Sequence, residues 1–100
     1  MFEGKEVFRH PTLTNASYIK TLVEQLEEEG EFANHGAASS LQAHLDTVVR
    51  FEKQEAAERV VKHMQSFKQL LENHKKDGLI SEVAYNDLKT NTDSLIKKWQ

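Results

Sequence analysis

The chain has 100 residues, a formal net charge of -3 at pH 7 and no cysteine. A chain of this length forms one domain, and without cysteine it can form neither a disulfide nor a thiolate metal site. The absence of a basic stripe argues against nucleic acid as a partner, and no apolar run approaches the ~18 residues of a membrane span.

The first predicted element is a non-helical arm. Residues 1–13 show no sustained apolar period and contain Pro11, the only proline of the chain. The same charged segment lacks the apolar core of a signal peptide. We therefore expect a linker or N-terminal arm over 1–13, followed by one helical domain over 14–100.

Two helices are predicted next, over about 15–29 and 36–52. Thr14 or Asn15 can cap the first, and Gly30 ends it, because glycine takes the left-handed position after a helix at little cost. The apolar residues that recur at helical spacing in these two segments are Ile19, Leu22, Val23, Leu26, Leu41, Leu45 and Val48.

The stretch RFEKQEAAERV interrupts this pattern without a glycine or a proline. Steps of three and four beyond Val48 reach only charged residues, namely Glu52, Glu55 and Arg59. The apolar residues resume out of phase, at Ala57, Val60 and Met64. One straight helix could not bury both stripes on one side. We therefore expect a break near Lys53 and Gln54, with a kinked continuous helix as the alternative.

The last two helices are predicted over about 55–77 and 81–98, separated by Gly78 and with Ser81 as the next cap. Their stripes contain Val60, Met64, Phe67, Leu71, Ala84, Tyr85, Leu88, Leu95, Ile96 and Trp99, and Thr92 interrupts the fourth. Short connections make neighbouring helices antiparallel. The predicted fold class is all-α: a small antiparallel bundle of about four helices in up-down-up-down order, with Phe67 and Leu71 buried.

Two of the five histidines are candidate metal ligands. His44 and His63 lie near the core seam, and a turn at 53–54 would set them at similar heights on adjacent helices. A zinc site requires further ligands, which Asp46 or Glu58 could supply only after rearrangement. The favoured interpretation is a pair of boundary histidines packed on the core, and no cofactor is expected.

An acidic run, EQLEEEGE, ends the first helix, with carboxylates at Glu24, Glu27, Glu28, Glu29 and Glu31. Carboxylates at a helix C-terminus oppose its dipole, at ~0.3–1 kcal/mol each when exposed. The spacing is not that of a calcium loop. The run is therefore either a solvated helix end or a binding surface for a cationic partner.

Aromatic residues could stack on sugars, and the candidates are Trp99, Tyr85, Phe51 and Phe32. Trp99 and Tyr85 fall on the apolar stripe of their helix, which favours core packing. No nucleophile elbow, phosphate loop or pair of catalytic acids occurs. We therefore assign no catalytic residue and expect that the domain is not an enzyme.

The chain from about residue 17 to 99 resembles the FIMAH family of helical domains. The resemblance rests on Gly30, Phe32, Asn34, Gly36, Ser40, Leu41, Leu45, Ala56, Ala57, Phe67, His74, Gly78, Ile80 and Ser81. The family's short glycine-containing turn before the third helix is replaced here by EKQE.

This resemblance implies a non-catalytic accessory module, often C-terminal, of secreted or cell-surface enzymes of Gram-positive bacteria. Such a module would position its parent enzyme at a wall polymer, a glycan or a protein partner, including the parent catalytic domain. The resemblance assigns no site residues. The alternative function is a ligand- or metal-binding helical bundle that uses His44 and His63.

Overall fold

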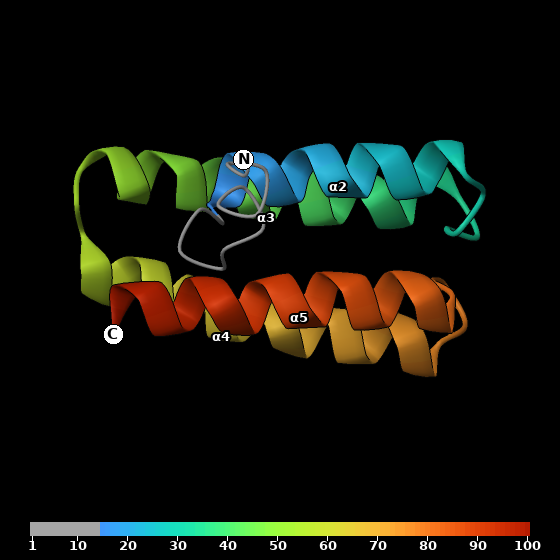
Figure 1. Cartoon of the computed structure of the whole chain (residues 1–100). Coiled ribbons are helices and arrows are strands. Elements are labelled where there is room, and N and C mark those ends of the chain that lie inside the picture. Colours follow the sequence, from blue (N-terminus) through green and yellow to red (C-terminus); the bar gives the residue numbers. More distant parts are fainter. Residues whose placement is uncertain (1–14) are drawn as a thin grey trace, which may run out of the picture.

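A computed structural model describes residues 15–100, which form a bundle of four α-helices (Figure 1). They are α2 (Ala16–Glu28), α3 (His35–Lys53), α4 (Ala57–Lys76) and α5 (Glu82–Trp99). The predicted fold class is confirmed, and the helix bounds agree with the predicted ones to within two residues. The predicted arm over 1–13 lies outside the described residues.

Side-chain oxygens cap three of the helix starts. Asn15, Asn34 and Ser81 each accept a hydrogen bond from the amide three residues later, at 2.8, 2.8 and 3.1 Å. These bonds satisfy amides that have no partner inside the helix. The start of α4 differs, because Ala56 has no side chain that can cap it.

The three turns between the described helices begin with the same backbone arrangement. After α2 and α4 the chain turns left-handed at Gly30 (φ 80°) and Gly78 (φ 76°), and after α3 it does so at Glu55 (φ 55°). In each turn the next amide donates to the carbonyl five residues earlier, at 2.8–3.0 Å, which is the Schellman arrangement. Glu55 thus holds the position of the missing turn glycine, and the predicted break after Lys53 is confirmed.

The four helices close around one core. Successive helices are antiparallel, and α2 packs against α5 as well as α3 (Figure 1). Phe67 and Leu71 are fully buried, as predicted, while Thr92 does not interrupt the α5 stripe but is itself fully buried. The other large, fully buried side chains are Ile19, Val23, Leu41, Leu45, Val48, Val60, Met64, Leu88 and Leu95. Each large aliphatic contributes ~1.5–3 kcal/mol by leaving water.

At one end of the bundle, here called the paired-loop end, the α2–α3 and α4–α5 connections bind each other. Phe32 and Ile80 form an isolated antiparallel β-bridge. Two backbone hydrogen bonds, of 2.8 and 3.0 Å, join the neighbouring residues of the same connections. The loop that contains the end of the acidic run is therefore fixed against the start of α5.

The opposite end of the bundle is here called the terminal end. The α3–α4 turn, the first residues of α2 and the last residues of α5 lie there (Figure 1). Glu52 at the end of α3 binds both α2 and α5. Its Oε1 accepts a hydrogen bond from the Ala16 amide at 2.9 Å, and its Oε2 accepts one from Trp99 Nε1–H at 3.0 Å. One carboxylate therefore links three helices.

Polar contacts on the surface join neighbouring helices. Lys68 on α4 pairs with Asp93 on α5 at 2.9 Å; this hydrogen bond and the charge of Asp93 raise the pKa of Lys68 above its ordinary value. Lys20 on α2 pairs with Asp46 on α3, and Gln42 Nε2 donates to the Lys20 carbonyl at 3.2 Å. Exposed pairs of this kind contribute about 0–1 kcal/mol each.

Candidate functional site

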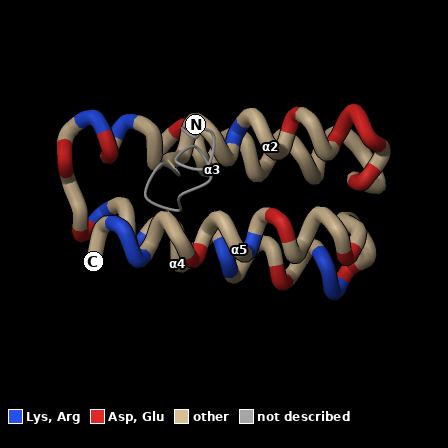
Figure 2. The backbone as a smooth tube through the Cα atoms, in the orientation of Figure 1, with Lys and Arg blue, Asp and Glu red and all other residues tan. Residues whose placement is uncertain are grey.

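The acidic run lies at the C-terminal end of α2, where Figure 2 shows acidic residues gathered at the paired-loop end. Glu24, Glu28 and Glu29 are exposed. Within residues 15–100 their carboxylates form no hydrogen bond or ion pair. These three side chains therefore present negative charge to solvent, and we call them the acidic surface.

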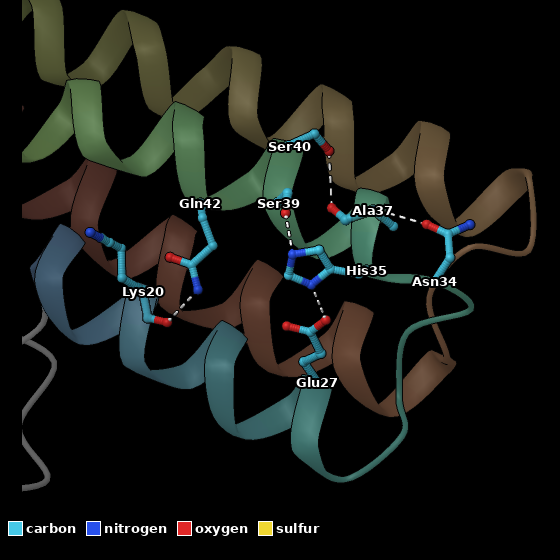
Figure 3. A network of polar contacts seen from close by, with 8 residues as sticks. All are labelled: Lys20, Glu27, Asn34, His35, Ala37, Ser39, Ser40 and Gln42. Atoms are coloured by element: carbon cyan, nitrogen blue, oxygen red, sulfur yellow. Dashed lines mark hydrogen bonds and ion pairs between the residues drawn. The ribbon is translucent and has the colours of Figure 1, made fainter.

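Glu27, a fourth member of the run, is bound to α3 instead (Figure 3). Its Oε2 accepts a hydrogen bond from His35 Nδ1–H at 2.6 Å. The other ring nitrogen of His35, Nε2, lies 3.0 Å from Ser39 Oγ, whose hydroxyl donates to it when the ring is neutral. Glu27 thus joins α2 to the first turns of α3, and its charge is not free for a partner.

Glu31, the fifth member, is bound to the start of α5. Its carboxylate accepts a hydrogen bond from Ser81 Oγ–H, and Ser81 Oγ accepts one from the Ala84 amide at 3.1 Å. The Ser81 cap is therefore oriented by Glu31. The predicted group of five glutamates divides into two that hold the fold and three that face solvent.

The two candidate metal ligands meet on α3 and α4, as the hairpin requires. The ring centroids of His44 and His63 are 5.7 Å apart. His44 Nε2–H donates to the backbone carbonyl of His63 at 2.7 Å, and His63 Nδ1–H donates to that of Arg59 at 3.2 Å. Two neutral rings would keep one free lone pair each, at His44 Nδ1 and His63 Nε2.

Further metal ligands are not gathered at this pair. No group of three or more His, Asp or Glu side chains placed to hold a metal occurs within residues 15–100. Asp46 pairs with Lys20. Aromatic rings pack on the histidines instead: Phe51 lies 4.8 Å from the His63 ring and Phe67 lies 5.7 Å from the His44 ring, between centroids. The arrangement is that of boundary histidines packed on the core.

Two further polar contacts were also missed by the sequence reasoning. His74, which is buried, lies 3.1 Å from Ser40 Oγ through its Nε2. Because Ser40 donates its hydroxyl proton to the Ala37 carbonyl at 2.9 Å, His74 Nε2–H is the donor of this bond. The other is the contact of Glu52 with Ala16 and Trp99 at the terminal end. Its only signal in the sequence was that Glu52 is a charged residue at a position where the apolar spacing of α3 would continue.

The aromatic residues considered for sugar stacking all pack partly buried against the core; they are Phe32, Phe51, Tyr85 and Trp99. Trp99 also borders two hollows at the terminal end. Trp99 therefore combines core packing with exposure to a hollow, as does Tyr85, which borders another hollow with Glu72, Lys75 and Lys76.

The sequence model of the FIMAH domain matches residues 16–97. The chain belongs to the FIMAH family. The match begins at the first residue of α2 and ends in the last turn of α5, so the FIMAH domain comprises all four described helices.

No curated protein and no solved structure matches this FIMAH chain. Across residues 15–100, no helix is both long enough and apolar enough to cross a membrane.

Proposed function

We propose that this FIMAH domain is a non-catalytic accessory module that binds a cationic partner through the acidic surface and so positions a parent enzyme. The observation that carries the proposal is that Glu24, Glu28 and Glu29 share one helix end without a bound countercharge within residues 15–100. The exposed carboxylates of Glu28 and Glu29, at the end of α2, oppose its dipole at ~0.3–1 kcal/mol each. Natural chains accept such local conflicts mainly at functional sites.

The acidic surface is held by a rigid support, which favours binding. The Glu27–His35 contact fixes the last turns of α2 to α3. The Phe32–Ile80 bridge and the Glu31–Ser81 hydrogen bond fix the following loop to α5. A partner would therefore meet preformed charges and would lose little free energy in ordering this part of the chain.

The sign of the charge discriminates among the possible partners. A polyanionic wall polymer would be repelled by three carboxylates, and a neutral glycan would gain no charge attraction from them. A protein surface rich in lysine and arginine gains both attraction and faster association. We therefore favour a protein partner, with the parent catalytic domain as the first candidate.

The cellular context of the proposal is a secreted or cell-surface bacterial enzyme, which is what the FIMAH resemblance implies. The contacts of three side chains of types common in catalytic sites support a non-catalytic role. His35 and His74 each bind a side chain of another helix, and Ser81 binds Glu31 in the α2–α3 connection; these contacts serve the fold.

Calorimetric titration of the chain with its parent catalytic domain, and with a lysine-rich peptide, tests the proposal. A Glu24/Glu28/Glu29→Gln variant should bind about tenfold more weakly or worse, a loss of ~1.4 kcal/mol or more. Wild-type affinity should fall between about 0.05 and about 0.5 M salt, because the Debye length is only ~8 Å at physiological ionic strength.

The matched control removes the same number of exposed charges elsewhere. Glu58→Gln, Glu72→Gln and Asp87→Asn, combined in one chain, replace side chains that are also exposed. This control should bind like the wild type. Equal binding by all three proteins across the salt range would reject the acidic surface as a binding site.

A second candidate function, a ligand- or metal-binding bundle, is favoured by one observation. The rings of His44 and His63 lie 5.7 Å apart, and each has a nitrogen that is not used in the contacts described above. A divalent metal bound there would need solvent or a partner to complete its coordination. Zinc titration distinguishes this function from the acidic-surface proposal.

A further inference from the structure

An open hollow of about 750 Å³ lies at the terminal end, between the first turns of α4 and the end of α5. Its apolar wall includes Val61 and Trp99, and its polar lining consists of Glu58, Lys62, Gln65 and Gln100. The volume lies in the range of ligand-binding clefts, about 300–1,000 Å³. We call it the Trp99 hollow.

The indole that forms one wall is fixed in place before any ligand arrives. Its Nε1–H donates to Glu52 at 3.0 Å, and the same carboxylate is held by the Ala16 amide. An aromatic ring that cannot rotate loses little entropy when a ligand stacks on it. Trp99 is therefore a preset platform as well as a core residue.

A second hollow, of about 290 Å³, shares the Trp99 wall. Lys98 lines this second hollow but not the first, and its Nζ lies 6.0 Å from the indole centroid. The lysine therefore interacts with the ring from the smaller hollow. The Trp99 hollow is the roomier of the two, and within residues 15–100 no lysine that lines it lies over the ring.

We propose that the Trp99 hollow binds a neutral carbohydrate chain, with the indole as the stacking platform. The C–H-rich face of a sugar ring is apolar and flat, so it matches the face of an aromatic ring. Sugar hydroxyls both donate and accept, and the side-chain amides of Gln65 and Gln100 do the same. The hydroxyls that leave water therefore find partners at the edge of the platform.

The charges at the hollow favour a neutral ligand over an ionic one. Glu58 and Lys62 are the charged side chains of its lining, and their opposite charges offset each other, so the side chains give no net attraction for an anion or a cation. The hollow is open rather than enclosed, which suits one segment of an extended chain better than a small apolar molecule. A polysaccharide segment meets both conditions.

This site goes beyond the proposed function and does not depend on it. The Trp99 hollow is lined by the start of α4 and the end of α5, and the acidic surface is at the C-terminal end of α2. Figure 1 shows that these helix ends lie at opposite ends of the bundle. One FIMAH domain could therefore hold a neutral glycan at one end and a cationic protein at the other.

Intrinsic fluorescence tests the inference directly, because Trp99 is the only tryptophan of the chain. The 100-residue chain is titrated with cellotetraose, maltotetraose and N-acetylchitotetraose as neutral probes, and with an oligogalacturonate as the anionic probe. We expect a saturable change with at least one neutral probe, with a dissociation constant on the order of 0.1–1 mM for a single open platform.

Two matched variants on α4 locate the binding. Gln65→Ala removes an amide from the hollow and should weaken binding by about fivefold, which corresponds to one net hydrogen bond. Gln69→Ala removes an amide that is also exposed, one turn further along and outside the lining, and should bind like the wild type. The Glu24/Glu28/Glu29→Gln variant should also bind like the wild type, which separates this site from the acidic surface.

Three results would overturn the inference: no saturable change with any neutral probe, preference for the anionic probe, or equal affinity of Gln65→Ala and wild type. A Trp99→Phe variant, followed by calorimetry because it is not fluorescent in the same range, gives an independent reading. It retains an aromatic ring but loses the Nε1–H bond that orients it, so it should bind more weakly than the wild type.

Discussion

Glu52 and Trp99 are 47 positions apart in the chain and are joined by a hydrogen bond of 3.0 Å. The other oxygen of the Glu52 carboxylate accepts the amide of Ala16, the first residue of α2. This amide has no partner inside its own helix. A residue at the end of α3 therefore completes the start of α2 and holds the end of α5.

Replacing Glu52 with glutamine should destabilise the domain by ~1–3 kcal/mol. The amide retains one oxygen acceptor, so one of the two N–H donors loses its partner and faces an NH₂ group instead. For a domain of this size each 1 kcal/mol lowers the melting temperature by roughly 4–8 °C. Thermal melts of Glu52→Gln and of the exposed control Glu72→Gln check this. Equal melting temperatures would show that the carboxylate contributes nothing.

Replacing Glu55 with glycine should stabilise the domain by ~0.5–1 kcal/mol. Glu55 has a φ of 55°. This left-handed conformation costs a residue with a side chain roughly 1–2 kcal/mol. Glycine avoids that cost, but it loses more conformational entropy on folding, and this loss offsets part of the gain. The control is Gln54→Gly, since Gln54 has a φ of -85° and glycine there should destabilise. Urea unfolding of both variants measures the difference, and a loss of stability in Glu55→Gly would contradict the argument.

The position of this turn could be predicted from the sequence, but its chemistry could not. The phase shift between the stripes of Val48 and Val60 showed that one helix could not bury both. No turn residue marked the break, because the chain uses Glu55 where glycine is the usual choice. The left-handed backbone at Glu55 is a local strain. The packing of α3 against α4 that compensates for it depends on the whole bundle, so it could not be predicted from the sequence of the turn.

Replacing Thr92 with valine should stabilise the domain by ~1–2 kcal/mol. Thr92 is fully buried, and its hydroxyl has no hydrogen-bond partner among the described residues. Valine has nearly the same shape and removes the buried polar group, whose desolvation costs ~1–3 kcal/mol. Thr90→Val, on the exposed side of α5, is the control and should change stability by less than ~0.5 kcal/mol. A destabilised Thr92→Val protein would mean that the hydroxyl does have a partner.

Replacing Phe67 with alanine should cost ~3–5 kcal/mol, because a large, fully buried ring leaves a cavity. This loss is a large part of the total stability of a small domain. Its exposed neighbour provides the control, and Ser66→Ala should leave the melting temperature nearly unchanged. A shift of only a degree or two in Phe67→Ala would show that the α4 stripe does not form the core.

The acidic surface shows where sequence reasoning about the site stops. The glutamate-rich run at the end of α2 could be recognised from the sequence alone. The division within it depends on His35, which comes from the next helix, and on Ser81, which lies 50 positions from Glu31. These partners come into reach only because α2 packs against α3 and α5. Sequence spacing alone could therefore identify the charged group but not the three carboxylates that remain exposed.

The last prediction concerns zinc and the His44–His63 pair. His44 would have to bind through Nδ1 or give up its 2.7 Å hydrogen bond to the His63 carbonyl, and structural zinc sites use four ligands. We therefore expect a zinc dissociation constant above about 1 μM, measured by competition with a fluorescent chelator. His35→Ala is the control, because His35 binds Glu27 and lies outside the pair. A sub-micromolar affinity that disappears in His63→Ala but persists in His35→Ala would favour the metal-binding function over the acidic surface.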